Sequence, residues 1–301
     1  MYDAIIIGKG PAGLSAGLYT TRSNLRTLII GKDDSWLRKA ERVDNYFGFA
    51  EPVSGEKLLE EGEKQVIRLG ADLIEDEVIA IEKKDDFFEV MTSKRKYICK
   101  AVLLATGRGQ KKLNVANLEK FEGKGVSYCP TCDGFFYNNM KVGVLGFKDY
   151  AVHEAKELEA FTDKITIYTN GMEPEFSGVY AEEAHRFPTN KKLIVRIDGD
   201  EFLQRIYFAD GSFEDIDGIF VAYESASSSD FARKLGVLYD GSSIVVDRFQ
   251  QTDMPGLFAA GDCTGGFKQI SIAVGQGALA GRKIIEYLRN LKEGTGFTRE
   301  E

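Results

Sequence analysis

Two cysteines separated by two residues, Cys129 and Cys132, are the residues whose types and spacing most directly suggest chemistry in this sequence. Such a pair can close into a disulfide and open into a dithiol, and motifs of this kind lower the pKa of one thiol. A four-ligand zinc site is poorly supported, because the chain has no second pair at this spacing and only 2 histidines. The pair therefore predicts redox chemistry and no metal ion. Half of a metal site, or two buried thiols, is the structural alternative.

Asp133 follows the second cysteine directly and is a candidate general acid or base, because no histidine is adjacent. A turn at Asp133–Gly134 is the structural alternative. The remaining cysteines, Cys99 and Cys263, have no close partner in the sequence, and we expect both to be buried and inert.

A glycine-rich turn near the N-terminus predicts a dinucleotide-binding site. It has the pattern Gly-x-Gly-x-x-Gly and lies between a predicted strand over 2–7 and a predicted helix over 14–23. The first glycine permits the turn, the second lets backbone amides approach a pyrophosphate, and the third lets helix and strand pack closely. The predicted cofactor-binding residues of this turn are Gly8, Gly10, Pro11, Ala12 and Gly13.

Two further turns at the ends of apolar strands strengthen this prediction. Ala105, Thr106 and Gly107 end one such strand, and Asp262 follows Gly261 at the end of another. A carboxylate at a strand end can bind a sugar or ribityl hydroxyl group. Each turn alone is common, but the three together are specific for a dinucleotide fold.

A second strand–turn–helix–strand unit begins at Val142, so the chain contains two openings of this kind. The predicted fold class is α/β, with two doubly wound, Rossmann-like dinucleotide-binding domains, the second inserted into the first. The predicted boundaries are 1–111 with 236–301 for the first domain and 112–235 for the second. A long helix over 275–290 has apolar residues at helical spacing and is predicted to pack on the first domain.

Three segments, 8–13, 126–134 and 257–262, resemble those of the low-molecular-weight thioredoxin reductases, in the same order and along nearly the whole chain. The resemblance implies non-covalently bound FAD in the first domain, a redox dithiol in the second, and a homodimer. It also implies that thioredoxin, or a similar protein disulfide, is the substrate.

The same resemblance assigns roles to individual residues. It implies that Cys132 lies nearer the flavin ring and that Asp133 is the proton donor and acceptor. The positions where the family contacts FAD are Asn45, Thr106, Asp262, Gln269 and Ile270.

The second domain departs from the family's NADPH-binding pattern at three positions. Lys148 stands at the second glycine of its turn, Asn170 stands where arginines or an acid are expected, and Glu224 follows where Gly-x-x-Pro is expected. The sequence therefore resembles the NADPH-independent branch, whose flavin receives electrons from reduced ferredoxin. NADPH, NADH, a reduced deazaflavin and a flavodoxin-like protein remain alternative donors. The family's flavin-side Gly-Gly-Gln is also replaced, and Trp36 there either covers the flavin or only packs.

Composition limits the partners of this chain. Its net charge of −8 disfavours nucleic acid, and its apolar runs are too short for a membrane span. No secretory signal pattern follows Met1, so we expect a cytoplasmic location. Two basic pairs, Arg38–Lys39 and Lys111–Lys112, are candidate docking residues for an acidic partner such as ferredoxin, although such pairs are usually solvated surface.

Two other functions remain open. A dithiol oxidase would pass electrons from a small dithiol through FAD to oxygen, but oxidases resembling this family tend to have histidine where this chain has Asp133. A flavoprotein redox sensor or scaffold would explain the degenerate second domain, but not the intact cysteine pair. We therefore predict a flavin-dependent disulfide reductase.

Overall fold

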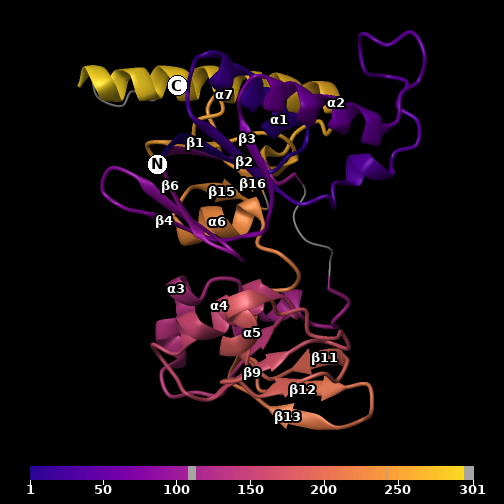
Figure 1. The fold of residues 1–301 in the computed structure, drawn as a ribbon. Helices are drawn as coiled ribbons and strands as arrows, with labels where there is room; N and C mark the ends of the chain where they lie inside the picture. The colour runs from indigo at the N-terminus through magenta and orange to yellow at the C-terminus, as the bar shows by residue number, and fades with distance from the viewer. Residues whose placement is uncertain (108–112, 242, 295–301) are drawn as a thin grey trace. The chain divides into compact units, whose positions relative to one another are not determined.

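The computed structural model describes residues 1–107, 113–241 and 243–294 (Figure 1). The chain divides into two compact units, and the second lies between the two sequence segments that form the first. The first unit comprises Met1–Gly109 with Ser227–Glu301, and the second comprises Gln110–Ala226.

Each unit is built on a Rossmann-like sheet, so the predicted α/β fold class is confirmed. The first unit resumes at Ser227, earlier in the chain than the predicted 236. Helix α6 (Ser228–Lys234) belongs to this unit because Ser228 N donates a hydrogen bond to Thr106 Oγ1 at 3.0 Å.

The first unit contains a seven-stranded sheet. Six strands follow the order β3-β2-β1-β6-β5-β4, and the seventh, β17, pairs with the C-terminal end of β6. Four of the strand pairings are parallel, whereas β5 pairs antiparallel with both β4 and β6. Ile5 and Ile6 of β1 are fully buried, as expected for a parallel strand covered on both faces. The strands are β1 (Tyr2–Ile7), β2 (Thr27–Gly31), β3 (Asp72–Glu75), β4 (Val78–Lys83), β5 (Phe88–Thr92), β6 (Lys96–Leu104) and β17 (Leu257–Ala259).

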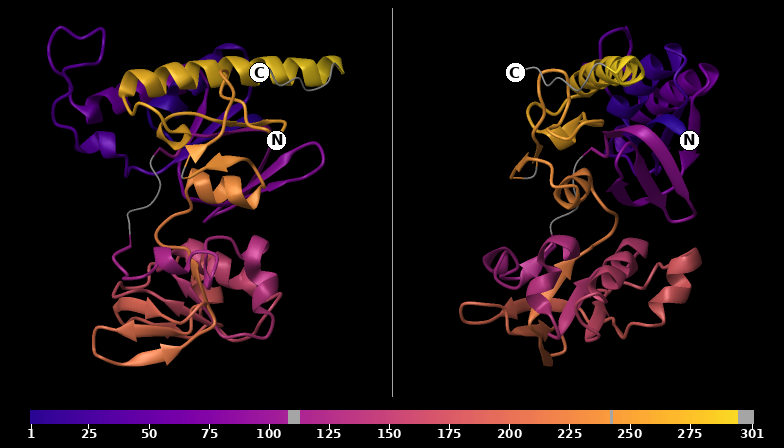
Figure 2. Two further views of the ribbon diagram at one scale, coloured as in Figure 1. Left: turned by 180° about the vertical axis from the view of Figure 1, so that it is seen from behind. Right: turned by 90° about the vertical axis from the view of Figure 1, so that its left-hand side faces the viewer.

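Helices α1 (Pro11–Arg22) and α7 (Ile270–Glu293) lie side by side in this unit (Figure 2). Their backbones approach closely at two glycines of α7. A Cβ atom on Gly277 would lie 2.1 Å from Ala12 O, and one on Gly281 would lie 2.8 Å from Ala16 O. The predicted C-terminal helix and its packing are therefore confirmed, although the helix begins earlier and is longer than 275–290.

The other elements of the first unit are short, apart from one helix. Helix α2 follows a loop in which Val43 and Val53 form an isolated antiparallel bridge. These elements are α2 (Gly55–Arg68), the 3-10 helices η1 (Trp36–Lys39) and η4 (Asp262–Thr264), and the paired strands β15 (Tyr239–Asp240) and β16 (Ser243–Ile244).

The second unit has a five-stranded parallel sheet with the order β10-β9-β8-β14-β7, and an antiparallel sheet of β11, β12 and β13. The parallel strands are β7 (Val126–Ser127), β8 (Val142–Leu145), β9 (Ile165–Tyr168), β10 (Thr189–Asn190) and β14 (Gly218–Val221). The antiparallel strands are β11 (Ile194–Asp198), β12 (Arg205–Phe208) and β13 (Phe213–Asp215). The helices are η2 (Glu119–Phe121), α3 (Pro130–Asp133), η3 (Gly134–Tyr137), α4 (Asp149–Leu158) and α5 (Gly178–Ala184).

The core of this unit lies between its two sheets and includes the buried side chains of Leu145, Tyr168, Ile206 and Ile219. Within the described part of the chain, no helix of either unit combines the length and apolarity needed to cross a membrane.

Candidate functional site

The N-terminal glycine turn has the geometry of a phosphate-binding loop. Gly8 has φ +115°, and a Cβ atom there would lie 2.1 Å from Ala105 O. A Cβ atom on Gly13 would lie 1.9 Å from Gly8 O, so both positions require glycine. Gly10 is different, because no atom lies within 4 Å of where its Cβ would stand. Gly10 is also the N-cap of α1 and gives it no side-chain cap, with Pro11 following. The start of α1 therefore has space and backbone donors for a pyrophosphate.

The fold brings the other predicted turns to the same helix. Gly261 has φ +86°, and a Cβ atom there would lie 3.1 Å from the Cβ of Ala12. Gly261 N donates to Gln276 Oε1 of α7 at 2.8 Å, which fixes the turn that leads into Asp262. Gly107 also has a positive φ, +75°. Its neighbour Thr106 contacts Ser228, with 2.6 Å between the two hydroxyl oxygens.

Asn45 and Gln269, which were predicted only by resemblance, lie together in the structure. Asn45 Nδ2 donates to Gln269 Oε1 at 3.0 Å, and Gln269 is the N-cap residue of α7, whose first residue is Ile270. The structure thus groups these three residues at the start of one helix. It also groups Ala105, Asp262 and the glycine turn around the start of the other.

The donors and the free space of this unit fit a flavin dinucleotide. The uncapped first turn of α1 and the open space at Gly10 match a pyrophosphate, and Asp262 at a strand end matches a ribityl or ribose hydroxyl group.

A charge cluster around the buried Lys9 side chain, at the end of β2, was not predicted. Lys9, only 9% exposed, forms ion pairs with Asp33 and with Glu63 of α2, the second at 3.7 Å. Arg38 contacts the same two carboxylates at 2.8 and 2.7 Å. The Lys9 ammonium, hydrogen-bonded to Asp33, holds the pKa of this carboxyl below its usual value. The available sequence signal was spacing, because Asp33 follows Gly13 by roughly 20 residues, where dinucleotide folds place the acid that binds a ribose.

This cluster corrects one prediction about Arg38. Its guanidinium is held by Asp33 and Glu63 inside the first unit and does not extend from the surface to meet a partner. Lys39 is exposed, and its ammonium lies 4.6 Å from the centre of the Trp36 ring, which is 62% exposed. The second basic pair, Lys111–Lys112, lies outside the described residues.

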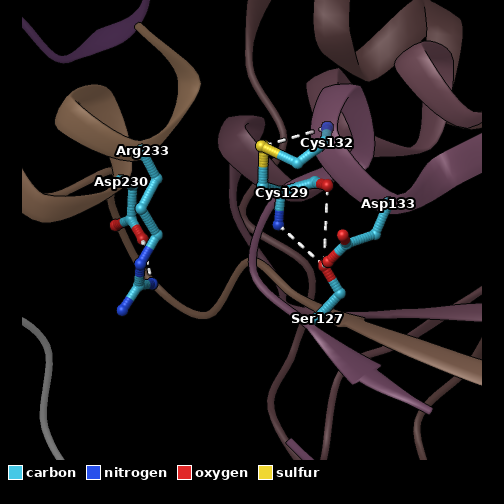
Figure 3. The surroundings of a disulfide bond; sticks show 6 residues. All are labelled: Ser127, Cys129, Cys132, Asp133, Asp230 and Arg233. Atoms are coloured by element: carbon cyan, nitrogen blue, oxygen red, sulfur yellow. Dashed lines mark hydrogen bonds and ion pairs between the residues drawn. A yellow bond between two sulfur atoms is a disulfide. The ribbon is translucent and has the colours of Figure 1, made fainter. Parts of the chain in front are cut away.

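In the second unit, Cys129 and Cys132 form a disulfide at the start of α3 (Figure 3). Cys129 is the N-cap residue of this short helix and is 4% exposed, whereas Cys132 is exposed. Pro130 fixes the first helical position, and Cys132 N donates to Cys129 Sγ at 3.1 Å. The disulfide therefore joins a buried residue to an exposed one.

Asp133 lies beside the disulfide turn and is connected to it by Ser127, a residue that sequence reasoning missed (Figure 3). Ser127 Oγ donates to Asp133 Oδ2 at 2.7 Å and accepts a hydrogen bond from Cys129 N at 3.0 Å. Tyr137 of η3 interacts with the charge of Asp133. Burial raises the pKa of the Tyr137 phenol, and the negative charge of the Asp133 carboxylate raises it further. Asp133 is thus hydrogen-bonded to a residue that also contacts the disulfide turn.

The two remaining cysteines are buried, as predicted. Burial raises the pKa of Cys99 to about 12 and that of Cys263 to about 11. Thiols that stay protonated at neutral pH are poor nucleophiles, which favours the prediction that both residues are inert.

The turn between β8 and α4 in the second unit is contacted by a later segment of the same unit, residues 175–177. Glu175 N donates to Phe147 O at 2.7 Å, and its carboxylate lies 3.5 Å from Lys148 Nζ. Ser177 donates from N and from Oγ to the Asp149 carboxylate, at 2.6 and 2.5 Å.

The rings of Phe147 and Tyr223 and the side-chain amide of Asn170 form further contacts in this unit. Phe147 packs edge-on against Tyr223 at 5.1 Å between ring centres, and Asn170 Oδ1 accepts from Ile194 N at 2.8 Å. Asp149 and Glu175, with the hydrogen bonds and the ion pair that they form within this unit, therefore lie at the start of α4, where the phosphates of a dinucleotide would bind.

Comparison with known proteins agrees with this geometry. Residues 2–277 match the pyridine nucleotide-disulphide oxidoreductase family. A thioredoxin reductase of Listeria monocytogenes is 32% identical, over 97% of this chain and 96% of that protein. The crystal structure of the atypical thioredoxin reductase TRi from Desulfovibrio vulgaris Hildenborough has 39% identity and a TM-score of 0.93, over 99% of this chain and 100% of that one. A ferredoxin-flavin thioredoxin reductase from Clostridium acetobutylicum has 30% identity and a TM-score of 0.70, over 96% and 98%.

The match covers both units, including the glycine turn and the disulfide, and the relatives have nearly the same length as this chain. The chain therefore belongs to the pyridine nucleotide-disulphide oxidoreductase family and, within it, to the FAD-binding thioredoxin reductases.

Proposed function

We propose that this chain reduces the disulfide of thioredoxin, or of a similar protein, with electrons that reach FAD from reduced ferredoxin. The observation that carries the proposal is the disulfide between Cys129 and Cys132, next to Asp133, in a chain whose other unit fits FAD. The residues proposed to hold FAD are Gly8, Gly10, Pro11, Ala12, Gly13, Asn45, Ala105, Thr106, Gly107, Asp262, Gln269 and Ile270.

The chemistry requires two electrons for each disulfide reduced. Bound FAD, once reduced by the donor, would supply two electrons to the Cys129–Cys132 bond, which with two protons would open to a dithiol. One thiolate then attacks the substrate disulfide and forms a mixed disulfide, and the other thiolate resolves it, restoring the bond between Cys129 and Cys132. We assign proton donation and acceptance during these steps to Asp133, because its carboxylate lies beside the turn.

The contacts around the second unit's turn support a donor other than NADPH. The Lys148 ammonium is paired with Glu175, and Ser177 binds the Asp149 carboxylate at the start of α4. Two carboxylates there would repel the phosphates of a nicotinamide dinucleotide. The likeness to a ferredoxin-flavin enzyme supports ferredoxin as the donor. Two successive one-electron transfers from reduced ferredoxin would supply the two electrons that the reduction of one disulfide requires.

Absorbance of the bound flavin tests this proposal. We expect no bleaching by NADPH or NADH under anaerobic conditions, prompt bleaching by reduced ferredoxin, and recovery when oxidised thioredoxin is added. Stoichiometric bleaching by NADPH within seconds would overturn the ferredoxin assignment. A reduced flavin that oxygen reoxidises and thioredoxin does not would favour the dithiol oxidase, and one that passes electrons to neither would favour a sensor.

We also propose that the chain forms a homodimer. Four large apolar side chains are exposed on the packed helices α1 and α7, namely Tyr19 (47%), Ile272 (41%), Leu279 (42%) and Leu291 (49%). Such side chains are consistent with a surface that a second copy covers. Analytical ultracentrifugation of the FAD-loaded protein should give the dimer mass, and a monomer at micromolar concentration would contradict this.

A further inference from the structure

Ser127, the last residue of β7, occupies a position that connects the acid to the disulfide turn (Figure 3). The residue is only 5% exposed, and its hydroxyl makes three contacts within one turn of the chain. Oγ donates to Asp133 Oδ2 at 2.7 Å, accepts from Cys129 N at 3.0 Å, and lies 3.5 Å from Cys129 O.

The three contacts are not equally strong. Cys129 O already accepts the backbone amides of Cys132, at 3.1 Å, and of Asp133, at 3.0 Å. A third donor at 3.5 Å adds little, so the single hydroxyl hydrogen of Ser127 points to the Asp133 carboxylate. An ionised carboxylate only accepts hydrogen bonds, and a hydroxyl that donates to it favours the ionised form.

The same hydroxyl also suits the protonated form of Asp133. A hydroxyl has one hydrogen and two lone pairs, and it rotates freely about the Cβ–Oγ bond. Once Asp133 carries a proton, the carboxylic acid can donate to Ser127 Oγ, while the hydroxyl hydrogen turns to Cys129 O. Oγ still accepts from Cys129 N, so the contact between Ser127 Oγ and Asp133 Oδ2 can persist in both states.

We propose that Ser127 is the positioning residue of Asp133, holding its carboxyl group beside the disulfide turn in both protonation states. The inference rests on the acid–base role proposed for Asp133. Ser127 contacts neither reacting sulfur, so it acts through Asp133 and through the backbone of Cys129.

Substitution at this position leaves the sheet intact, because β7 pairs with β14 through backbone atoms, with Ser127 opposite Phe220. Ser127→Ala removes the hydroxyl. Ser127→Thr and Ser127→Val form a matched pair of nearly equal shape, of which only Thr keeps the hydroxyl. This pair gives the same readout if the alanine variant does not fold.

The experiment uses the FAD-loaded enzyme reduced with dithionite and mixed rapidly with oxidised thioredoxin across a range of pH. Asp133→Asn identifies the limb of the pH profile that belongs to Asp133, because that limb disappears. We expect Ser127→Ala and Ser127→Val to slow flavin reoxidation about tenfold and to change this limb of the profile, because the Asp133 carboxyl group loses the contact that positions it. Ser127→Thr should keep the wild-type limb, and the thioredoxin KM should not change.

Two results would overturn the inference, and they are distinguishable. A rate that falls equally at every pH in Ser127→Ala and Ser127→Val, with the limb unmoved, would show that Ser127 is only structural while Asp133 keeps its role. An Asp133→Asn enzyme with the rate and pH profile of the wild type would instead remove the acid–base role itself, and the Ser127 assignment with it.

Discussion

Asn45 donates a hydrogen bond to Gln269 at 3.0 Å and so joins a loop before α2 to the N-cap of α7, 224 residues further along the chain. Each side-chain amide has one further polar atom, which under the proposed function would bind FAD. We therefore expect Gln269→Ala to raise the FAD dissociation constant about tenfold, the effect of one lost hydrogen bond. Fluorescence titration of the apoprotein measures this, and exposed Gln65→Ala on α2 is the control. Equal affinities in the two variants would remove Gln269 from the site.

Gly10 and Gly13 should respond to substitution in opposite ways. Gly10 has φ −82° and open space where its Cβ would stand, so Gly10→Lys should fold but lose FAD. Gly13→Ala should destabilise the fold itself, because its Cβ would lie 1.9 Å from Gly8 O. The ratio of flavin to protein absorbance and the apoprotein Tm separate the two effects. A Gly10→Lys protein with its full FAD complement would contradict the placement of the pyrophosphate.

The cysteine pair should be separable from flavin binding. Cys129→Ser and Cys132→Ser lie in the second unit and should keep FAD while abolishing thioredoxin reduction. Asp133→Asn should slow turnover by about 10²–10⁴-fold, the usual contribution of one positioned acid or base. Steady-state rates with a chemically reduced donor measure all three variants. Turnover that survives either cysteine change would refute the relay, and a loss under about threefold would leave Asp133 as a turn residue.

The ion pairs of Lys9 should contribute to stability in a pH-dependent way. The pKa of Asp33 is lower in the folded chain than its ordinary value of 3.8, mainly because of Lys9. This contribution is present above the ordinary value and is lost as the pH falls through the folded value. Lys9→Met should therefore lower the free energy of unfolding by about 1–2 kcal/mol at pH 7, a figure reduced because Asp33 is half exposed.

Urea unfolding of the apoprotein at pH 7 and at pH 3 measures this difference. The gap between wild type and Lys9→Met should be smaller at the lower pH. Lys57→Met is the control, since Lys57 forms an exposed pair with Glu61 at 2.9 Å, and solvent screening makes the contribution of such a pair small. A gap that grows as the pH falls would contradict the assigned cause.

The parts of the site that sequence reasoning predicted are local in the chain. The turn from Gly8 to Gly13 and the pair Cys129–Cys132 place their own atoms within a few residues, so spacing alone constrains their geometry. The fold followed because each glycine turn joins an apolar strand to a helix, and such a unit has few ways to bury its strand.

The parts that were missed depend on contacts between distant segments. Lys9 meets Glu63 because α2 packs against α1 and η1, and Ser228 meets Thr106 across 122 residues. Arg38 was interpreted as a docking residue because it is next to Lys39 in the sequence. The sequence does not show that its side chain pairs with Asp33 and Glu63. Ser127 is only six residues from Asp133, but a lone serine before a cysteine motif carries no periodic or spacing signal.

The close contact of Gly277 with Ala12 sets the order in which the molecule can be completed during synthesis. When the ribosome has released the chain as far as Ala226, the whole second unit is available to fold. The first unit at that moment lacks β17 and α7, including the residues that pack on α1 and hold the Gly261 turn. We therefore expect the first unit to bind FAD only after α7 has been synthesised and has packed on α1.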